Sequence, residues 1–232
     1  SFAGKTVNPA IDLAEMLIKS APPAGRNSQM SKVQFAASGS EANDTAIKIV
    51  WYYHAAKGTP EKRKIISRKR GYHGVTIAAA SMTALPYAQD GFGLPLDFVK
   101  HTTTPDYYND ALEGESEADF VARCAAELEA LILAEGPETV GALFAEPVMG
   151  AGGVIIPPAG YFATIREVLH KYDVLLVADE VICGFGRTGN MWGSQTMDVQ
   201  PDMLTCAKAL SAADLPIAAV MMSDPSDAPL AE

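Results

Sequence analysis

The sequence predicts an α/β fold in which helices are layered on a mostly parallel sheet, and three observations support this. Short apolar runs alternate along the chain with segments whose apolar residues recur at helical spacing. Two of the runs, 140–145 and 174–178, are continuously apolar, as strands buried on both faces are. The segments between runs are long enough for the helical crossovers that parallel neighbours require. With 232 residues, 48% of them hydrophobic, the chain can bury the core of one large domain.

The first predicted elements run to residue 82. A helix begins at Asn8, which can cap it ahead of Pro9, and ends before Pro22. A short buried strand starts at Val33, and the helix that follows it ends at Gly58. The next two elements are a strand and a helix of small residues, at 64–67 and 75–82.

The alternation continues beyond residue 98. The stretch 103–116 is rich in Asp, Asn, Tyr and Glu, which is typical of a surface loop. The helical pattern is strongest at 117–134, and a further helix is predicted at 161–171. The strands predicted in this part are 98–102, 140–145, 174–178, 203–207 and 217–222.

The overall charge favours small-molecule partners. A formal net charge of -10 would repel both nucleic-acid phosphates and anionic lipids. The basic cluster from Lys62 to Arg70 is interpreted as a solvated rim around a strand rather than a nucleic-acid site. No apolar run is long enough to cross a membrane, and the first residues do not read as a secretory signal.

The cysteine pattern predicts neither a disulfide framework nor a metal site. Cys124, Cys183 and Cys206 are widely spaced, odd in number and without Cys-x-x-Cys or His pairing. A reducing cytoplasm is therefore the expected location.

Four motifs that follow predicted strands are candidates for the functional site, because ligands of such folds bind outside the carboxyl ends of strands. In the first motif, Gly39 allows the backbone to approach a ligand and Ser40 offers a hydroxyl. The unpaired amides of the helical turn that begins there favour a phosphate. The structural alternative is a capping box in which Ser38 pairs with Glu41.

The second motif, Gly71-Tyr72-His73-Gly74, places an aromatic ring and an imidazole directly after a strand. A flat heteroaromatic ligand needs an aromatic or apolar face on which to lie. Taken alone, Tyr72 is equally typical of a packing residue, and His73 is more typical of a structural one.

The third motif is the pair of carboxylates Asp179 and Glu180, which follows a continuously apolar run. A carboxylate at the end of a buried strand requires a positively charged or donating partner. Metal binding would need a His or Asp cluster at matching spacing, and the sequence has none. A protonated ring nitrogen would be a suitable partner.

The fourth motif is Lys208, which stands among small and apolar residues. Partial burial would favour the neutral amine that Schiff-base formation requires. The structural alternative is an ordinary surface lysine near the end of a strand.

Taken in order, these motifs resemble the class III (omega-type) aminotransferases, fold type I enzymes that use pyridoxal 5′-phosphate (PLP). The resemblance covers nearly the whole chain, with tract 50–74 most similar to the branch that uses omega-amino acids or amines with pyruvate. It implies a three-layer α/β/α large domain over 1–232 and a homodimer for the full-length protein. A nucleotide-binding doubly wound domain is not favoured, because it would need a Gly-x-Gly-x-x-Gly turn after the first strand and an acidic residue on the second, and no such turn follows the first predicted strand. The matching segments are 38–48, 71–74, 146–158, 178–189 and 201–210.

The resemblance also implies roles for single residues. Lys208 would hold the cofactor in a Schiff base, and Asp179 would hydrogen-bond its pyridinium nitrogen. Arg187 is interpreted as shaping a turn near the site rather than contacting substrate. Glu146 would lie beside the other ring substituents or the network around Asp179. The predicted cofactor-binding set, in which Tyr72 and Val181 enclose the ring and Gly39 and Ser40 hold the phosphate, is Gly39, Ser40, Tyr72, His73, Glu146, Asp179, Val181 and Lys208.

The implied activity is transamination, in which an amine or omega-amino acid passes its amino group to a keto acid such as pyruvate. The alternatives are a decarboxylase or an aminomutase on the same fold, or an inactive fragment of it. In that family the arginine for the substrate carboxylate and a threonine for the partner subunit's phosphate follow the lysine segment, beyond Glu232. The chain opens on Ser1 without an initiator Met. Two features differ from the family pattern: Asp214 stands where relatives often carry a bulkier residue, and residues 224–232 differ from the family's continuation.

Overall fold

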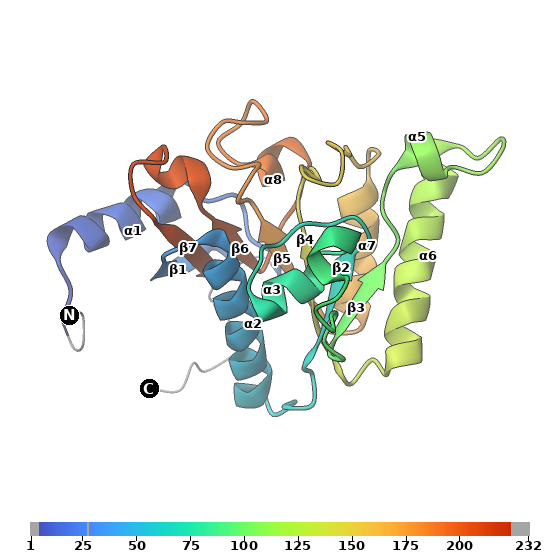
Figure 1. Cartoon of the computed structure of the whole chain (residues 1–232), viewed down its shortest axis with the longest axis horizontal. Helices are drawn as coiled ribbons and strands as arrows, with labels where there is room; N and C mark the ends of the chain where they lie inside the picture. The colour runs from blue at the N-terminus through green and yellow to red at the C-terminus, as the bar shows by residue number, and fades with distance from the viewer. Residues whose placement is uncertain (1–4, 27, 224–232) are drawn as a thin grey trace.

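The computed structural model describes residues 5–26 and 28–223, and its centre is a seven-stranded sheet (Figure 1). The strand order is β1-β7-β6-β5-β4-β2-β3, and every neighbouring pair is parallel except the two that β7 makes. The two ends of the domain predicted over 1–232, including 224–232, lie outside the described residues. The strands are β1 (Met30–Ala36), β2 (Lys64–Arg68), β3 (Val99–Thr102), β4 (Val140–Ala145), β5 (Leu175–Asp179), β6 (Met203–Cys206) and β7 (Ala218–Ser223).

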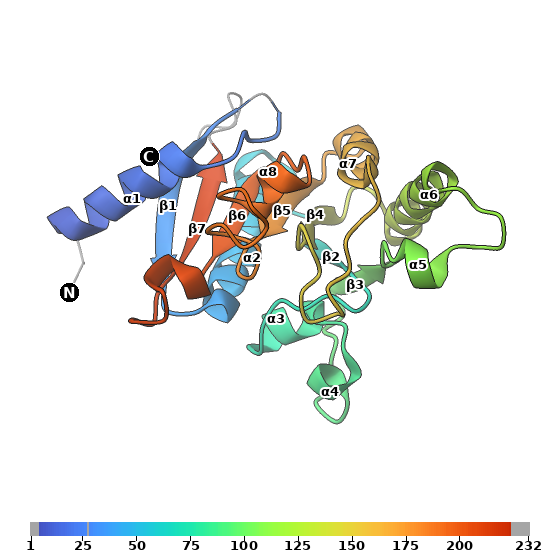
Figure 2. The same ribbon diagram turned by 90° about the horizontal axis from the view of Figure 1, so that it is seen from above.

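Helices cover both faces of this sheet, which makes three layers (Figure 2). The helices α2 and α3 pack on one face, and α1, α6, α7 and α8 lie on the other. The predicted α/β fold with a mostly parallel sheet is therefore confirmed. The helices are α1 (Asn8–Ser20), α2 (Gly39–Ala56), α3 (Ile77–Met82), α4 (Pro86–Gln89), α5 (Tyr107–Asp110), α6 (Glu117–Glu135), α7 (Tyr161–Lys171), α8 (Gly193–Thr196) and a 3₁₀ helix (Lys208–Ser211).

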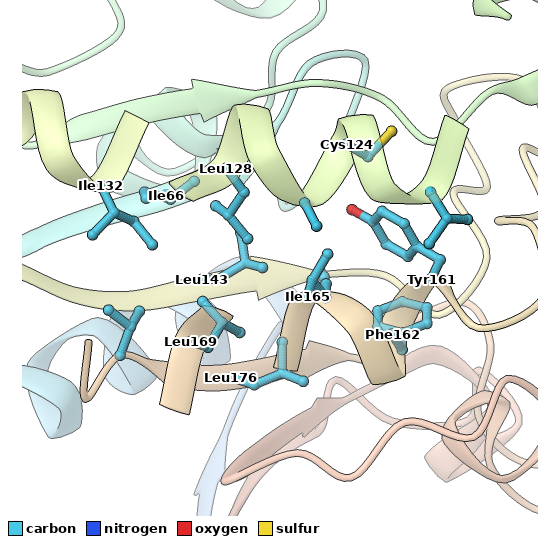
Figure 3. Close-up of a cluster of buried hydrophobic side chains, with 14 of the residues drawn as sticks. Ile66, Cys124, Leu128, Ile132, Leu143, Tyr161, Phe162, Ile165, Leu169 and Leu176 are labelled. Carbon is cyan, nitrogen blue, oxygen red and sulfur yellow. The ribbon is translucent and has the colours of Figure 1, made fainter. Parts of the chain in front are cut away.

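The core between α6, α7 and the sheet is apolar and fully enclosed (Figure 3). Leu128 and Ile132 are one helical turn apart on α6, so both side chains point toward β4. Ile165 of α7 and Leu143 of β4 complete the contact. This cluster holds the sheet rigid behind the edge at which the strands end.

Replacing Leu128 by alanine is expected to lower the free energy of unfolding by about 2–5 kcal/mol, because it removes buried methyl groups and leaves a cavity. Leu128 is 1% exposed, whereas Leu133 on the same helix is 53% exposed. Leu133→Ala is thus a matched control with an expected change within about 0.5 kcal/mol. Urea denaturation measures both, and equal effects would contradict the assigned packing.

Two helix predictions were wrong in detail. Val7, not Asn8, occupies the capping position of α1, so Asn8 and Pro9 form its first turn and the helix begins without a side-chain cap. The stretch 103–116 contains the short helix α5, which the predicted surface loop did not include. Asp106 caps α5 by accepting from the amide of Asn109, a local interaction that compositional reasoning does not detect.

The basic cluster is only partly a solvated rim. Lys62 is 6% exposed, and its ammonium group donates to the main-chain oxygens of Pro137, Val140 and Tyr172. Arg68 is fully buried and donates to the main-chain oxygen of Glu146. Burial lowers the pKa of Lys62. The prediction failed here because main-chain oxygens beside β2 can pair with a cation, and composition does not show this.

The three cysteines are buried as free thiols in the described structure. Burial raises the pKa of Cys124 to about 11, and of Cys183 and Cys206 to about 12. Because the thiolate is the reactive form, the native protein is expected not to react with a thiol reagent near pH 8. The urea-unfolded chain should react at all three positions. Rapid labelling of native protein would contradict this burial.

Candidate active site

All eight residues of the predicted cofactor-binding set line one cavity of about 270 Å³. The cavity lies where the carboxyl ends of the parallel strands meet, because each of the four motifs directly follows a strand of the sheet. The four motifs are far apart in the sequence, and the order of the strands in the sheet brings them together.

Asp179 is the last residue of β5 and is 3% exposed. Its Oδ2 accepts from His73 Nδ1 and from Asn43 Nδ2, each at 2.8 Å. Its Oδ1 accepts from the amide of Val181 at 3.1 Å. A carboxylate offers about four acceptor positions, so one position remains on Oδ1 for a donor in the cavity.

Glu146 connects the two loops that border the cavity. Its Oε1 accepts from the amide of Tyr72 and its Oε2 from the amide of Gly150, each at 3.0 Å. Burial raises the pKa of this carboxyl group. Glu146 therefore holds the loop that presents Tyr72, and neither of these bonds involves Asp179.

At 38–41 the start of α2 is both a capped helix end and a turn that faces the cavity, the two interpretations given for the first motif. Ser38 Oγ accepts from the amide of Glu41 at 3.2 Å, so Ser38 does cap α2. The carboxylate of Glu41 accepts from the amide of Ala37 at 2.8 Å rather than from that of Ser38. The cap fixes the turn, and the turn presents the next two residues to the cavity.

Gly39 and Ser40 occupy the first turn of α2, whose amides have no acceptor within the helix. A Cβ at Gly39 would lie 3.0 Å from both methyl carbons of Val181, so glycine permits the close approach of these two segments. Ser40 Oγ accepts from the amide of Val75 at 3.0 Å. The two unpaired amides and the helix dipole make this turn suitable for a phosphate.

Lys208 begins the 3₁₀ helix that follows β6, and its φ of 47° is in the left-handed region. Such backbone is uncommon for a residue with a side chain and is frequent at functional sites. The expected partial burial was wrong for the described residues: Lys208 is exposed, although Ala207 before it is buried. The reason is that the turn carries the side chain to the open rim of the cavity.

The two adjacent carboxylates of the third motif point in different directions. Glu180 is fully buried away from the cavity, where it accepts from the amides of Gly193 and Ser194 at 2.9 and 2.5 Å. Burial raises its pKa. Glu180 therefore anchors the start of α8.

Two residues that flank the site do not line the cavity. Arg187 is exposed and donates from Nε to the main-chain oxygen of Ile182 at 2.7 Å, which fits the interpretation that it shapes a turn. Asp214 is exposed in the turn after the 3₁₀ helix. Ile182 itself lines the cavity, so Arg187 acts on the site through the backbone.

The sequence analysis assigned no role to Asn43 or Thr205, although both lie in segments that match the family, 38–48 and 201–210. Both are fully buried, and Thr205 Oγ1 donates to Asn43 Oδ1 at 2.9 Å. Asn43 lies four residues after Gly39, one helical turn further along α2. A polar residue at that spacing inside an apolar helix face was the signal available in the sequence.

Comparison with known proteins decides the family: the model described as aminotransferase class-III matches residues 1–226. The chain belongs to the class III aminotransferase family. The gamma aminobutyrate transaminase 1, mitochondrial, of Solanum lycopersicum is 52% identical over 96% of this chain and 42% of its own length. A vanillin aminotransferase of Capsicum chinense is 50% identical over 96% of this chain and 48% of its own length.

Solved structures of related enzymes show the same fold. The omega transaminase from Pseudomonas jessenii in complex with PMP superimposes with a TM-score of 0.93 at 55% identity, over 97% of this chain and 48% of that one. This aminotransferase chain thus spans about half the length of the relatives it matches. PLP, the cofactor predicted from the sequence, is the cofactor of the family.

The residues around the cavity fit PLP. The open acceptor position on Asp179 suits the ring nitrogen, and the unpaired amides at the start of α2 suit the phosphate. Lys208 supplies an amine at the rim of the same cavity. Among the described residues there is no group of His, Cys, Asp and Glu able to hold a metal ion. No described helix is both long and apolar enough to span a bilayer.

Proposed function

We propose that the full-length protein transfers an amino group from an amine or omega-amino acid to a keto acid such as pyruvate, with PLP as cofactor. The observation that carries this proposal is that Asp179, with an open acceptor position, and Lys208 line the same cavity. The buried anion suits the ring nitrogen of PLP, and the amine suits its carbonyl group.

The chain's own residues have separate tasks in this proposal. PLP, when bound, supplies a carbonyl group that exchanges amines and a ring that accepts electrons from the substrate. Lys208 Nζ would hold the carbonyl carbon of the cofactor and, when free, would accept the proton that leaves the substrate carbon and donate it to that same cofactor carbon. Asp179 Oδ1 would accept a hydrogen bond from the protonated ring nitrogen. Tyr72 and Val181 would enclose the ring.

The test is to supply the purified protein with PLP, an amine donor and pyruvate and to measure alanine. Two donors, 4-aminobutyrate and a simple primary amine, distinguish an omega-amino acid specificity from an amine specificity. Alanine formation that depends on donor and PLP supports the proposal. Protein that binds PLP but releases carbon dioxide from an amino acid instead would support a decarboxylase.

The assembly and the cellular location are part of the same proposal. We expect the full-length protein to be a homodimer in a reducing compartment such as the cytoplasm, with no nucleic-acid or membrane partner. The buried free thiols support a reducing compartment, and the net charge of -10 supports the absence of nucleic-acid and membrane partners. The homodimer rests on the resemblance to the family. Analytical ultracentrifugation measures the assembly, and fractionation of cells measures the location.

A further inference from the structure

Asn43 is surrounded by hydrogen-bond partners although it lies inside α2. Its Nδ2 donates to Asp179 Oδ2 at 2.8 Å and to the main-chain oxygen of His73 at 2.7 Å. Its Oδ1 accepts from Thr205 Oγ1 at 2.9 Å. The side chain is fully buried, and it links the helix to the loop after β2 and to the strands β5 and β6.

Asp179 and the main-chain oxygen of His73 determine which way the Asn43 amide faces, and the hydroxyl of Thr205 completes its hydrogen bonds. A flipped amide would place Oδ1 against Asp179 and against the main-chain oxygen of His73, which are both acceptors. The hydroxyl of Thr205 can accept as well as donate, so Thr205 alone would not oppose the flip. In the described orientation Nδ2 donates two hydrogen bonds and Oδ1 accepts one. Hydrogen bonding therefore assigns the amide orientation unambiguously.

The bond from Asn43 makes the two carboxylate oxygens of Asp179 unequal. Oδ2 already accepts from His73 and Asn43, so both of its acceptor positions are used. Among the described residues, Oδ1 accepts only from the amide of Val181. We propose that Asn43, held in place by Thr205, is a positioning residue that directs Oδ1 of Asp179 to the ring nitrogen of the cofactor. This inference rests on the proposed function.

Asparagine suits this role because it donates a hydrogen bond without carrying a charge. Aspartate has the same shape, but its carboxylate would face Asp179 Oδ2 across the present 2.8 Å contact. Two ionised carboxylates so close repel each other, so the pair would take up a proton more readily than Asp179 alone as the pH falls. The other titratable groups that line or border this part of the site are Tyr72, His73, Glu146, Glu180 and Lys208.

The first experiment measures PLP affinity of Asn43→Asp in the full-length protein. At about pH 8 we expect binding weaker by on the order of 10- to 100-fold, because a buried acceptor loses its donor. The ratio of variant to native affinity should return toward one as the pH falls, since a protonated Asp can donate. Asn190→Asp is the control, because Asn190 is exposed. A pH-independent ratio would indicate a packing role and overturn the proposal.

The second measurement is the ¹⁵N chemical shift of the ring nitrogen in labelled PLP, which reports its protonation. We expect a shift toward the unprotonated value in Asn43→Asp and a smaller shift in Thr205→Val, which has the same shape but lacks the hydroxyl. Thr164→Val, at a more exposed hydroxyl that bonds only within its helix end, is the control. An unchanged ¹⁵N chemical shift in both site variants would refute the proposal that Asn43 directs Asp179 Oδ1 to the ring nitrogen.

A cofactor-free experiment separates this inference from the proposed function. Asn43→Asp should lower the melting temperature of the apoprotein, and the exchange Asn43→Asp with Asp179→Asn should restore part of it, since it removes the like-charge pair while the main-chain oxygen of His73 still lacks its donor. The exchange should not restore PLP binding, because the charge has left position 179. If native protein binds no PLP, the proposed function fails while this rescue still tests the network. No rescue would overturn the inference.

Discussion

Replacing Lys208 by alanine is expected to reduce transamination by at least about 10⁴-fold, the upper range for one positioned acid–base group. The expected loss is this large because the proposed mechanism uses the same amine twice, for the covalent bond to PLP and for proton transfer. The absorbance of covalently bound PLP should disappear with the activity. Steady-state kinetics and a spectrum of the PLP-loaded protein are the measurements.

Lys48→Ala is the matched control for this prediction, because Lys48 is an exposed lysine on α2. It should keep both the absorbance and the rate. If Lys208→Ala keeps the absorbance of bound PLP, another lysine carries the cofactor and the assigned role is wrong. Lys208 is exposed, so its loss should change the melting temperature of the apoprotein little.

Replacing Asp179 by asparagine is expected to lower kcat/KM for amine and pyruvate by about 10²–10³-fold, the range for removing one preorganised electrostatic group. The side chain keeps its shape, but the buried anion that holds a proton on the ring nitrogen is lost. His73 and Asn43 also lose a charged acceptor. The measurement is kcat/KM with saturating PLP, so that weaker cofactor binding does not enter.

Asp198→Asn provides the control, because Asp198 is an exposed aspartate before β6 in left-handed backbone that asparagine also adopts. Its kcat/KM should equal that of the native protein. A native rate in Asp179→Asn would show that the charge at the end of β5 is not used in the reaction.

The fold was predictable to a large extent because its strands are buried on both faces. Continuous apolar runs such as 140–145 read directly as strands, and the helices between them fix the parallel direction. The antiparallel direction of β7 could not be predicted, since a run of apolar residues does not indicate in which direction the strand runs in the sheet. The helix α5 was missed because a single capping carboxylate, Asp106, determines it.

The candidate site was predictable at the ends of strands and not inside the helix. Asp179 and Lys208 follow strands, so topology alone places them at one edge of the sheet. Asn43 and Thr205 were missed because their importance comes from contacts between distant segments. The exposure of Lys208 was mispredicted because neighbours in sequence do not determine which side of a turn a side chain takes.

The most direct test of the central claim is to reduce the PLP-loaded protein with borohydride and map the modified peptide by mass spectrometry. Reduction makes the bond between lysine and cofactor permanent, so the label marks the residue that forms it. A single pyridoxyl group on Lys208 is the predicted result. A label on another lysine, or no label on protein that retains PLP, would contradict the account.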